Sequence, residues 1–218
     1  MVEVKKYHLR PTALIPNSPL PLLHYPGLLD QQLTSPSPAV SLYNLYTSNS
    51  WSPQWIFRYG PTQRAHYHSR AHEAMAVLSG TATIRFGVAD TSPDLDASTS
   101  GDAHESGGVE IAAKAGDVFI IPAGVAHKTH DTTPAEFALL SPGDGHGIAE
   151  AEKGKLEGLE LEGFVMMGAY PKGAAEWDFA IGGESDGKYE SVWSVPVPGR
   201  DPVLGEDEEG VRGLWKRE

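Results

Sequence analysis

The chain has 218 residues and contains no cysteine. That absence excludes disulfide bonds, thiolate metal ligands and cysteine nucleophiles. Long apolar runs are also missing, and none approaches the ~20 residues that a membrane-spanning helix requires. Residues 1–8 lack the apolar core of a secretory signal, so we expect a cytoplasmic protein.

Basic residues are scarce, with 17 Lys and Arg against 29 Asp and Glu and a formal net charge of −12. This balance argues against nucleic acid or an anionic membrane surface as a partner. We interpret most of the acidic residues as solvated surface. Several of them fall in residues 201–218, which we predict to be an acidic C-terminal tail.

Glycine and proline, by contrast, are plentiful, with 24 Gly and 17 Pro spread along the chain. This distribution is typical of many short strands joined by turns. Hydrophobic patterning and turn residues predict strands at 55–59, 73–78, 81–86, 109–113, 117–121, around His127, and at 135–140, 164–169 and 191–197. Evenly spaced short strands favour an all-β, double-sheet jelly roll.

Three regions interrupt this pattern. Residues 1–40 are rich in proline, and we predict an extended arm with at most one short helix near 28–33. Its leucines would otherwise expose apolar surface, so the arm should pack on the barrel. Residues 89–108 and 142–163 are polar and are interpreted as surface insertions, which leaves one domain at 41–200.

Two segments about fifty residues apart carry potential metal ligands. The first segment reads Gly60-x5-His66-x-His68-x4-Glu73-x6-Gly80, and the second reads Gly116-x5-Pro122-x-Gly124-x2-His127. His66 and His68 are two positions apart, so on a strand both side chains point to the same face. Three imidazoles and one carboxylate suit Fe, Mn, Co, Ni, Cu or Zn and are poor ligands for Ca or Mg. We predict one divalent transition metal ion bound by His66, His68, Glu73 and His127.

The two segments resemble the paired motifs of the cupin superfamily, closely so over residues 55–131. The flanks 15–17, 20–22, 168–171 and 177–178 resemble stand-alone, single-domain cupins of bacteria and fungi. This resemblance implies an RmlC-like double-stranded β-helix, or jelly-roll barrel, with a metal site, and it implies no particular substrate. The motif pair occurs once, so we expect a monocupin. Asp131 stands where the family pattern often has Asn.

Two polar residues outside the ligand set are candidates for the pocket. Arg64 has the same strand parity as His66 and His68, so it either lines the pocket mouth and holds an anionic group or is simply exposed. Asp131 has the same parity as His127 and could face the pocket.

For four other residues close to the proposed ligands in sequence, packing is the alternative to a role in the pocket. His72 and His130 have the opposite parity to the ligands beside them, so we expect both to point away from the metal, in a supporting or packing role. Met75 and Val77 share the parity of Glu73, and they fit an apolar pocket wall and a plain core equally well.

These features favour a metal-dependent, dioxygenase-like enzyme acting on a small organic molecule. Two alternatives remain open: a metal-dependent isomerase or lyase, and a non-catalytic cupin that binds a metal or a ligand. A carbohydrate-epimerase-like cupin fits less well, because such proteins generally lack the metal ligands. We also expect a homodimer, because residues 73–78 are apolar on both faces of their strand.

Overall fold

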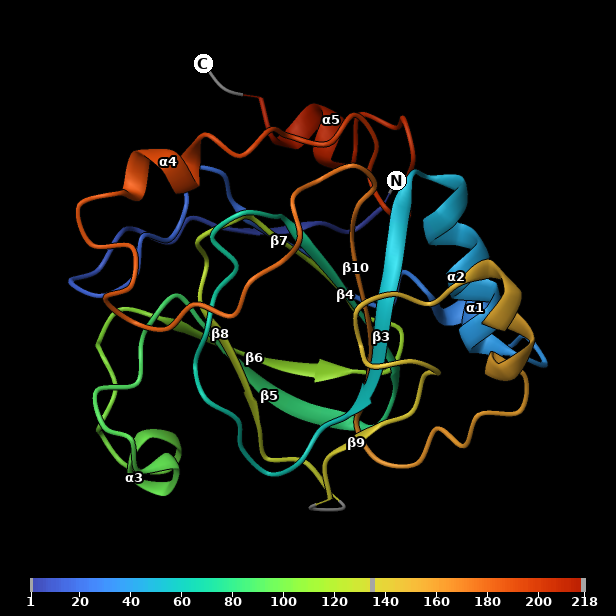
Figure 1. The fold of residues 1–218 in the computed structure, drawn as a ribbon, viewed down its shortest axis with the longest axis horizontal. Helices are drawn as coiled ribbons and strands as arrows, with labels where there is room; N and C mark the ends of the chain where they lie inside the picture. The colour runs from blue at the N-terminus through green and yellow to red at the C-terminus, as the bar shows by residue number, and fades with distance from the viewer. Residues whose placement is uncertain (1, 134–135, 217–218) are drawn as a thin grey trace.

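The computed structural model describes residues 2–133 and 136–216, which form two antiparallel β-sheets (Figure 1). The larger sheet has the strand order β1 (Lys5–Tyr7), β2 (Leu22–Tyr25), β7 (Val118–Ile121), β4 (Glu73–Ser79), β10 (Val165–Pro171), β3 (Trp51–Arg58) and β9 (Ala138–Leu139). The smaller sheet has the order β6 (Val109–Lys114), β5 (Thr81–Phe86) and β8 (His127–His130). The fold is therefore built mostly from β-strands, as the sequence predicts.

The two faces of the larger sheet are both covered. Along β4, Met75 and Val77 face the space between the sheets and pack in one apolar cluster with Ile84 and Phe86 of β5. The alternate residues of β4, such as Ala76, belong to a second cluster on the outer face. This two-residue period places Glu73, the first residue of β4, on the inner side of the sheet.

Helices cover the outer face and the ends of the sheets. Their bounds are α1 Asp30–Leu33, α2 Pro38–Ser48, α3 Leu95–Thr99, the 3-10 helix η1 Glu150–Leu156, α4 Tyr189–Trp193 and α5 Val211–Leu214. Helix α2 begins with a proline, whose fixed φ suits the first helical turn. Its buried residues are Ala39, Leu42, Tyr43 and Tyr46, one face of the helix, and α2 packs beside β3 (Figure 1).

The prediction of an N-terminal arm is wrong in one respect. Residues 2–40 do pack on the body of the protein, but they also supply two strands of the larger sheet, with Leu23 paired to Ile120. Prolines at 21 and 26 flank β2 without interrupting its hydrogen bonds. The short helix expected near 28–33 is confirmed as α1.

The C-terminal segment is not a detached acidic tail. Asp201 is fully buried and accepts hydrogen bonds from the Tyr25 hydroxyl at 2.7 Å and from the Val211 amide at 3.1 Å. Trp215 is 2% exposed, and its indole donates to the carbonyl of Pro21 at 2.8 Å. Residues 201–216 therefore belong to the folded core, while residues 217–218 lie outside the described part of the chain.

The other strand predictions fall into three groups. Those at 55–59, 73–78, 81–86, 109–113, 117–121, 164–169 and around His127 are confirmed, with boundaries that shift by a few residues. The strand at 135–140 shrinks to β9, and residue 135 lies outside the described residues. The strand at 191–197 is wrong, because 189–193 form α4, which buries only Val192.

The two predicted insertions are folded segments. Residues 89–108 contain α3 and bury Ser98, and 142–163 contain η1 and bury Leu156. Among the described residues, no helix has the length and apolar character needed to cross a membrane. The apolar outer face of β4 is covered within the chain, so the reason for expecting a homodimer no longer holds, and the homodimer itself stays a prediction.

Candidate metal centre

The two motif segments lie side by side and bring three histidines together. The amide of His127 donates to the carbonyl of His66 at 2.8 Å, and the amide of His66 donates back at 3.1 Å. The amide of Gly124, in the turn before β8, donates to the carbonyl of His68 at 2.9 Å. Gly124 has φ +89°, and a Cβ there would overlap the Asn17 carbonyl, so this turn requires glycine. His66 and His68 share a face as expected, although their segment forms isolated bridges rather than a full strand.

Each histidine ring is held by a main-chain carbonyl. Nδ1 of His66 lies 3.1 Å from the carbonyl oxygen of Arg64, and Nδ1 of His127 lies 3.4 Å from that of Val125. Nδ1 of His68 bonds the carbonyl of Asp178. A carbonyl can only accept, so each Nδ1 carries a proton, and in the neutral form of each ring Nε2 is the nitrogen with a lone pair.

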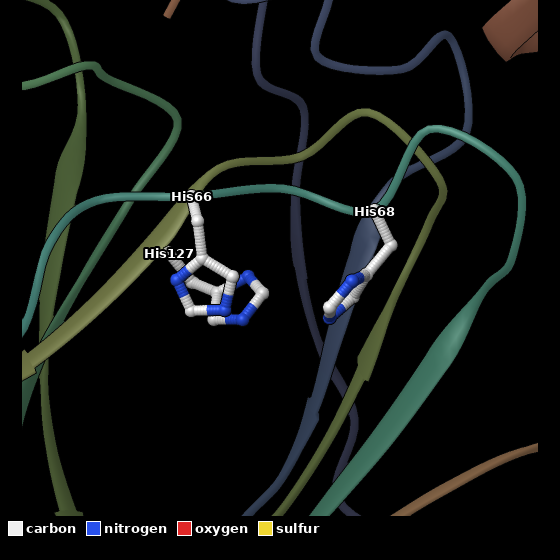
Figure 2. A group of neighbouring side chains, drawn as sticks. All are labelled: His66, His68 and His127. Atoms are coloured by element: carbon white, nitrogen blue, oxygen red, sulfur yellow. The ribbon is translucent and has the colours of Figure 1, made fainter. Parts of the chain in front are cut away.

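The three rings lie on the same side of their two segments, as Figure 2 shows. One ring nitrogen from each of His66, His68 and His127 lies within 4.8 Å of the others, and all three residues are buried. Hydrogen bonds from the second ring nitrogen to carbonyl groups are typical of metal-ligating histidines. The donor set therefore fits a transition metal ion.

Glu73 completes the cluster from the start of β4. It is 1% exposed, with Oε1 3.3 Å from Nε2 of His68 and Oε2 3.3 Å from Nε2 of His127. The hydroxyl of Tyr170 donates to Oε1 at 2.6 Å, whereas Oε2 has no hydrogen-bond partner among the described residues. A buried carboxylate oxygen without a partner is costly. A cation between Oε2 and the imidazoles would satisfy it.

The protonation states suit metal binding. Burial lowers the pKa of His127 to about 4 and, together with His127 and His68, holds the pKa of His66 well below its usual value. Burial also disfavours the charged form of His68, but the adjacent Glu73 outweighs it and raises the pKa of His68. Although burial opposes its ionisation, His68 and His127 lower the pKa of Glu73 to about 2. Neutral imidazoles and an ionised carboxylate are the forms that bind metals.

A cavity of about 210 Å³ opens beside these four side chains. Its other lining residues are Trp55, Phe57, Tyr59, Gln63, Phe137, Tyr170, Trp177 and Phe179. None of these residues is predicted to line the pocket from the sequence. The only signal available was that Tyr170 and Trp177 fall in flanks that resemble other single-domain cupins.

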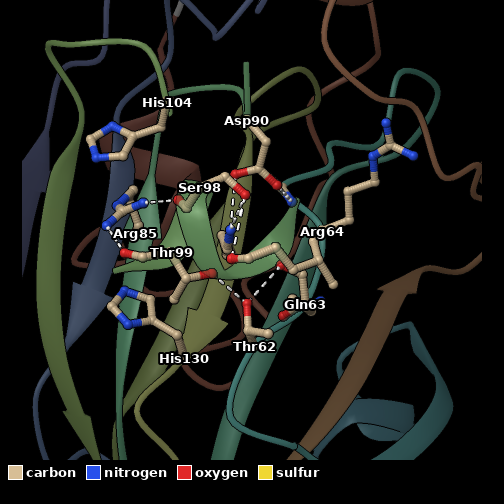
Figure 3. A network of polar contacts seen from close by, with 12 residues as sticks. Thr62, Gln63, Arg64, Arg85, Asp90, Ser98, Thr99, His104 and His130 are labelled. Carbon is tan, nitrogen blue, oxygen red and sulfur yellow. Dashed lines mark hydrogen bonds and ion pairs between the residues drawn. The ribbon is translucent and has the colours of Figure 1, made fainter. Parts of the chain in front are cut away.

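Both predicted pocket residues outside the ligand set point elsewhere. The side chain of Arg64 is exposed, does not line the cavity, and extends away from the polar network of Figure 3, although its carbonyl holds His66. Asp131 is exposed, and its carboxylate lies 3.0 Å from Nδ1 of His130. The strand parity fails for Asp131 because β8 ends at His130 and Asp131 adopts φ +59°.

The remaining neighbours pack as supporting residues. Nδ1 of His72 accepts from the amide of Ala123 at 3.0 Å, and the His72 ring lies 4.8 Å from that of Trp215. His72 and His130 both point away from the metal centre, as predicted. Met75 and Val77 belong to the core between the sheets and do not line the cavity.

A buried ion pair between Asp90 and Lys128 links the two segments that carry the proposed ligands, and Asp90 is labelled in Figure 3. Asp90 accepts from the amide of Ala65, next to His66, at 2.9 Å and from Nζ of Lys128, next to His127, at 3.0 Å. Lys128 is 1% exposed, and its ammonium group also lies 3.3 Å from Oγ of Ser98. One carboxylate thus fixes the spacing of two ligand segments.

Comparisons with known proteins agree with this site. Residues 61–147 match the family model described as Cupin, and these residues include both histidine segments. The uncharacterised protein YjlB of Bacillus subtilis (strain 168) is 27% identical over 94% of this chain and 93% of its own length.

Solved structures give weaker likenesses. The vicilin of Solanum melongena has a TM-score of 0.31 and 17% identity over 58% of this chain, and a mutant of Bacillus subtilis oxalate decarboxylase has a TM-score of 0.30 and 13% identity over 59%. This chain spans about a quarter of each of those proteins, 25% and 24%. The matching family model, together with the buried histidines that the two motifs bring together, supports membership of the cupin superfamily for the part of the chain that the model covers.

Proposed function

We propose that this protein binds one divalent transition metal ion, among Fe, Mn, Ni, Zn, Co and Cu, through His66, His68, His127 and Glu73. The observation that carries the proposal is the convergence of one ring nitrogen from each of three buried histidines beside a buried carboxylate oxygen that has no hydrogen-bond partner among the described residues. Carbonyl bonds at every Nδ1 hold the rings in the orientation that a metal ion needs.

We further propose that the metal ion is a reaction centre in an oxygenase-like enzyme that acts on a small organic molecule. The cavity reaches the ligand atoms directly, whereas structural metal sites are usually closed. When bound, a redox-active ion held by histidines and a carboxylate with open positions can activate O2. The aromatic walls would exclude water from the reacting atoms.

The polar groups of the cavity favour redox chemistry over isomerase or lyase chemistry. Apart from the four proposed ligands, the described lining residues with polar side-chain groups are Trp55, Tyr59, Gln63, Tyr170 and Trp177, and none of them is a ready base. Burial and the nearby Glu73 raise the pKa of Tyr170 well above its usual value, so its hydroxyl stays protonated. An isomerase or lyase would need a residue that accepts a proton from the substrate.

Tyr170 positions Glu73 in this scheme. Its hydroxyl donates to Oε1 at 2.6 Å and lies 3.1 Å from Nε2 of His68. With Oε1 engaged, Oε2 is left to face the metal ion, so Glu73 would bind through one oxygen.

Metal analysis tests the metal site. Untagged protein should contain close to one equivalent of a transition metal by mass spectrometry, and H66A/H68A should contain none. The control H8A/H104A removes two histidines outside the centre and should retain the metal. Full metal occupancy in H66A/H68A would refute the assignment.

Oxygen uptake tests the enzyme. Metal-loaded protein should consume O2 with a subset of small organic compounds, and H66A/H68A should not. Metal binding without turnover of any compound would instead favour the non-catalytic binding cupin.

We also infer that the two sheets close in the double-stranded β-helix of cupins, which the shared apolar cluster between them supports. The homodimer is retained as a proposal on the general tendency of such barrels to pair. Light scattering at micromolar concentration tests it, and a monomeric mass would contradict it.

A further inference from the structure

Seven aromatic side chains line the cavity next to the proposed metal centre, and they are Trp55, Phe57, Tyr59, Phe137, Tyr170, Trp177 and Phe179. They come from four separate parts of the chain: β3 with the residue that follows it, the segment before β9, β10, and the loop after β10. Aromatic rings offer flat faces that stack on other rings at centroid distances of about 4.5–7 Å. The walls of this cavity are therefore built largely of planar surfaces.

One wall is held by contacts among its own rings. Trp55 stacks on Phe57 with centroids 4.8 Å apart and an interplanar angle of 24°. Phe57 contacts Phe137 at 5.1 Å. Trp55 rests against the backbone of Gly168, where any Cβ would overlap its indole ring. This wall is fixed before a ligand arrives.

A second wall includes the proposed ligand side chains. Phe179 stacks on the ring of His66 with centroids 3.9 Å apart and an interplanar angle of 11°. Trp177 stacks on Tyr170 at 5.7 Å and 6°. The two walls enclose about 210 Å³. An apolar cavity of about 150 Å³ is large enough for benzene, so this one has room for a single substituted ring.

The charged groups of the lining are confined to the metal centre. The described lining residues other than the histidines and Glu73 carry no ionisable charge at neutral pH. A ligand is therefore met by a metal ion at one end and by uncharged rings elsewhere. Such a site favours one oxygen-bearing group on an otherwise apolar molecule.

The mouth of the cavity carries the two most exposed rings. Phe137 is 57% exposed and Phe179 is 51% exposed, and among the described residues these are the large hydrophobic side chains that solvent reaches. Both line the cavity as well. Exposed apolar groups beside a pocket mark a ligand-binding surface.

From these observations we propose that the site binds a planar, single-ring aromatic compound that carries a carboxylate or an equivalent oxygen donor. Phe137 and Phe179 act as specificity-determining residues that stack on its ring. The oxygen donor of the ligand is inferred from the metal site of the proposed function. The aromatic ring of the ligand is inferred from the aromatic walls of the cavity.

Calorimetric titration with benzoate and cyclohexanecarboxylate tests the inference. The two probes carry the same charged group, and only benzoate is planar. Zinc-loaded protein avoids turnover, because Zn²⁺ has no redox chemistry. We expect benzoate to bind about 10-fold more tightly than cyclohexanecarboxylate, as stacking on two ring faces would give. F179L should remove most of this preference, whereas F179Y, which keeps a ring, should retain it.

The result separates the inference from the proposed function. Stoichiometric zinc with equal affinities for the two probes, or with no binding of either at millimolar concentration, would overturn the aromatic assignment and leave the metal site standing. If zinc does not bind, the proposed function fails, and zinc-free protein is titrated with toluene and methylcyclohexane instead. A preference for toluene in that case supports the aromatic pocket, and its absence refutes it.

Discussion

Replacing Asp90 with asparagine should destabilise the protein strongly although the shape of the side chain hardly changes. Asp90 accepts from the amide of Ala65 at 2.9 Å and from Nζ of Lys128 at 3.0 Å. Asparagine can still accept one of these hydrogen bonds, but it carries no charge. The ammonium group of Lys128, in a residue only 1% exposed, would then have no counter-ion.

The size of the effect follows from that uncompensated charge. Breaking a buried ion pair by removing one partner costs about 3–5 kcal/mol. Because the hydrogen bond to Ala65 is retained, we expect D90N to lower the free energy of unfolding by about 3 kcal/mol, the lower end of this range. For a domain of this size that corresponds to a fall in melting temperature of about 6–12 °C. Because Ala65 precedes His66, D90N should also weaken metal binding.

Urea unfolding at pH 7, followed by tryptophan fluorescence, measures the decrease in the free energy of unfolding. The matched control is D90N/K128M, which also replaces Lys128, whose ammonium group has lost its counter-ion, with an apolar side chain of similar length. We expect the double variant to recover most of the stability, since apolar replacement of a buried ion pair is often neutral. The reasoning is refuted if D90N lies within about 1 kcal/mol of the parent protein, or if D90N/K128M is no more stable than D90N.

Three further predictions concern the site and the C-terminus. Y170F, which removes the hydrogen bond to Oε1 of Glu73, should lower metal affinity about 10–100-fold by competition with a chelator, whereas Y46F should not, because the buried Tyr46 hydroxyl has no hydrogen-bond partner among the described residues. The pKa of His127 is about 4 in the folded protein against 6.5 for an ordinary histidine, so the unfolded chain takes up the proton first, and metal-free protein should lose stability relative to H127Q as pH falls from 6.5 towards 4. Parallel melting profiles of the two proteins over that pH range would contradict this. W215A should cost about 3–5 kcal/mol in urea unfolding, because Trp215 is buried in the core, and an unchanged midpoint would restore the view of a detached tail.

The sequence predicts the strands of the two motif segments well because their patterning and turn residues are local. It predicts β2 poorly, because residues 22–25 are buried on both faces and stand between prolines that suggest an extended arm. Helix α2 is a different case. Its buried residues Ala39, Leu42, Tyr43 and Tyr46 have helical spacing, so the sequence does carry a local signal for this helix.

The candidate metal ligands could be predicted because their spacing is fixed within each motif. The parity argument holds for His72, which points away from the metal centre. It fails for Asp131, since a left-handed residue at the end of a strand no longer follows the two-residue period. Arg64 fails for a related reason, because its segment is irregular before His66.

The aromatic walls could not be predicted by local reasoning at all. Trp55, Phe137 and Phe179 are far apart in sequence and meet only after β3, β9 and β10 have paired. In isolation each of them reads as an ordinary strand or loop residue. The proposed substrate recognition would thus depend on tertiary placement, whereas the proposed metal binding would depend on two short motifs.

The arrangement of Glu73 and His127 is itself an argument for a cation. Nδ1 of His127 is committed to the carbonyl of Val125, so Nε2 presents a lone pair, and Oε2 of Glu73 lies 3.3 Å away with lone pairs of its own. Two acceptors at that distance repel each other in a buried site. Burial keeps His127 neutral by lowering its pKa, so the conflict is not relieved there by a proton. His68, whose pKa is raised beside Glu73, is the imidazole that can carry the compensating proton when metal is absent. Metal binding should then release that proton, and calorimetry near neutral pH in buffers of different ionisation enthalpy would detect it.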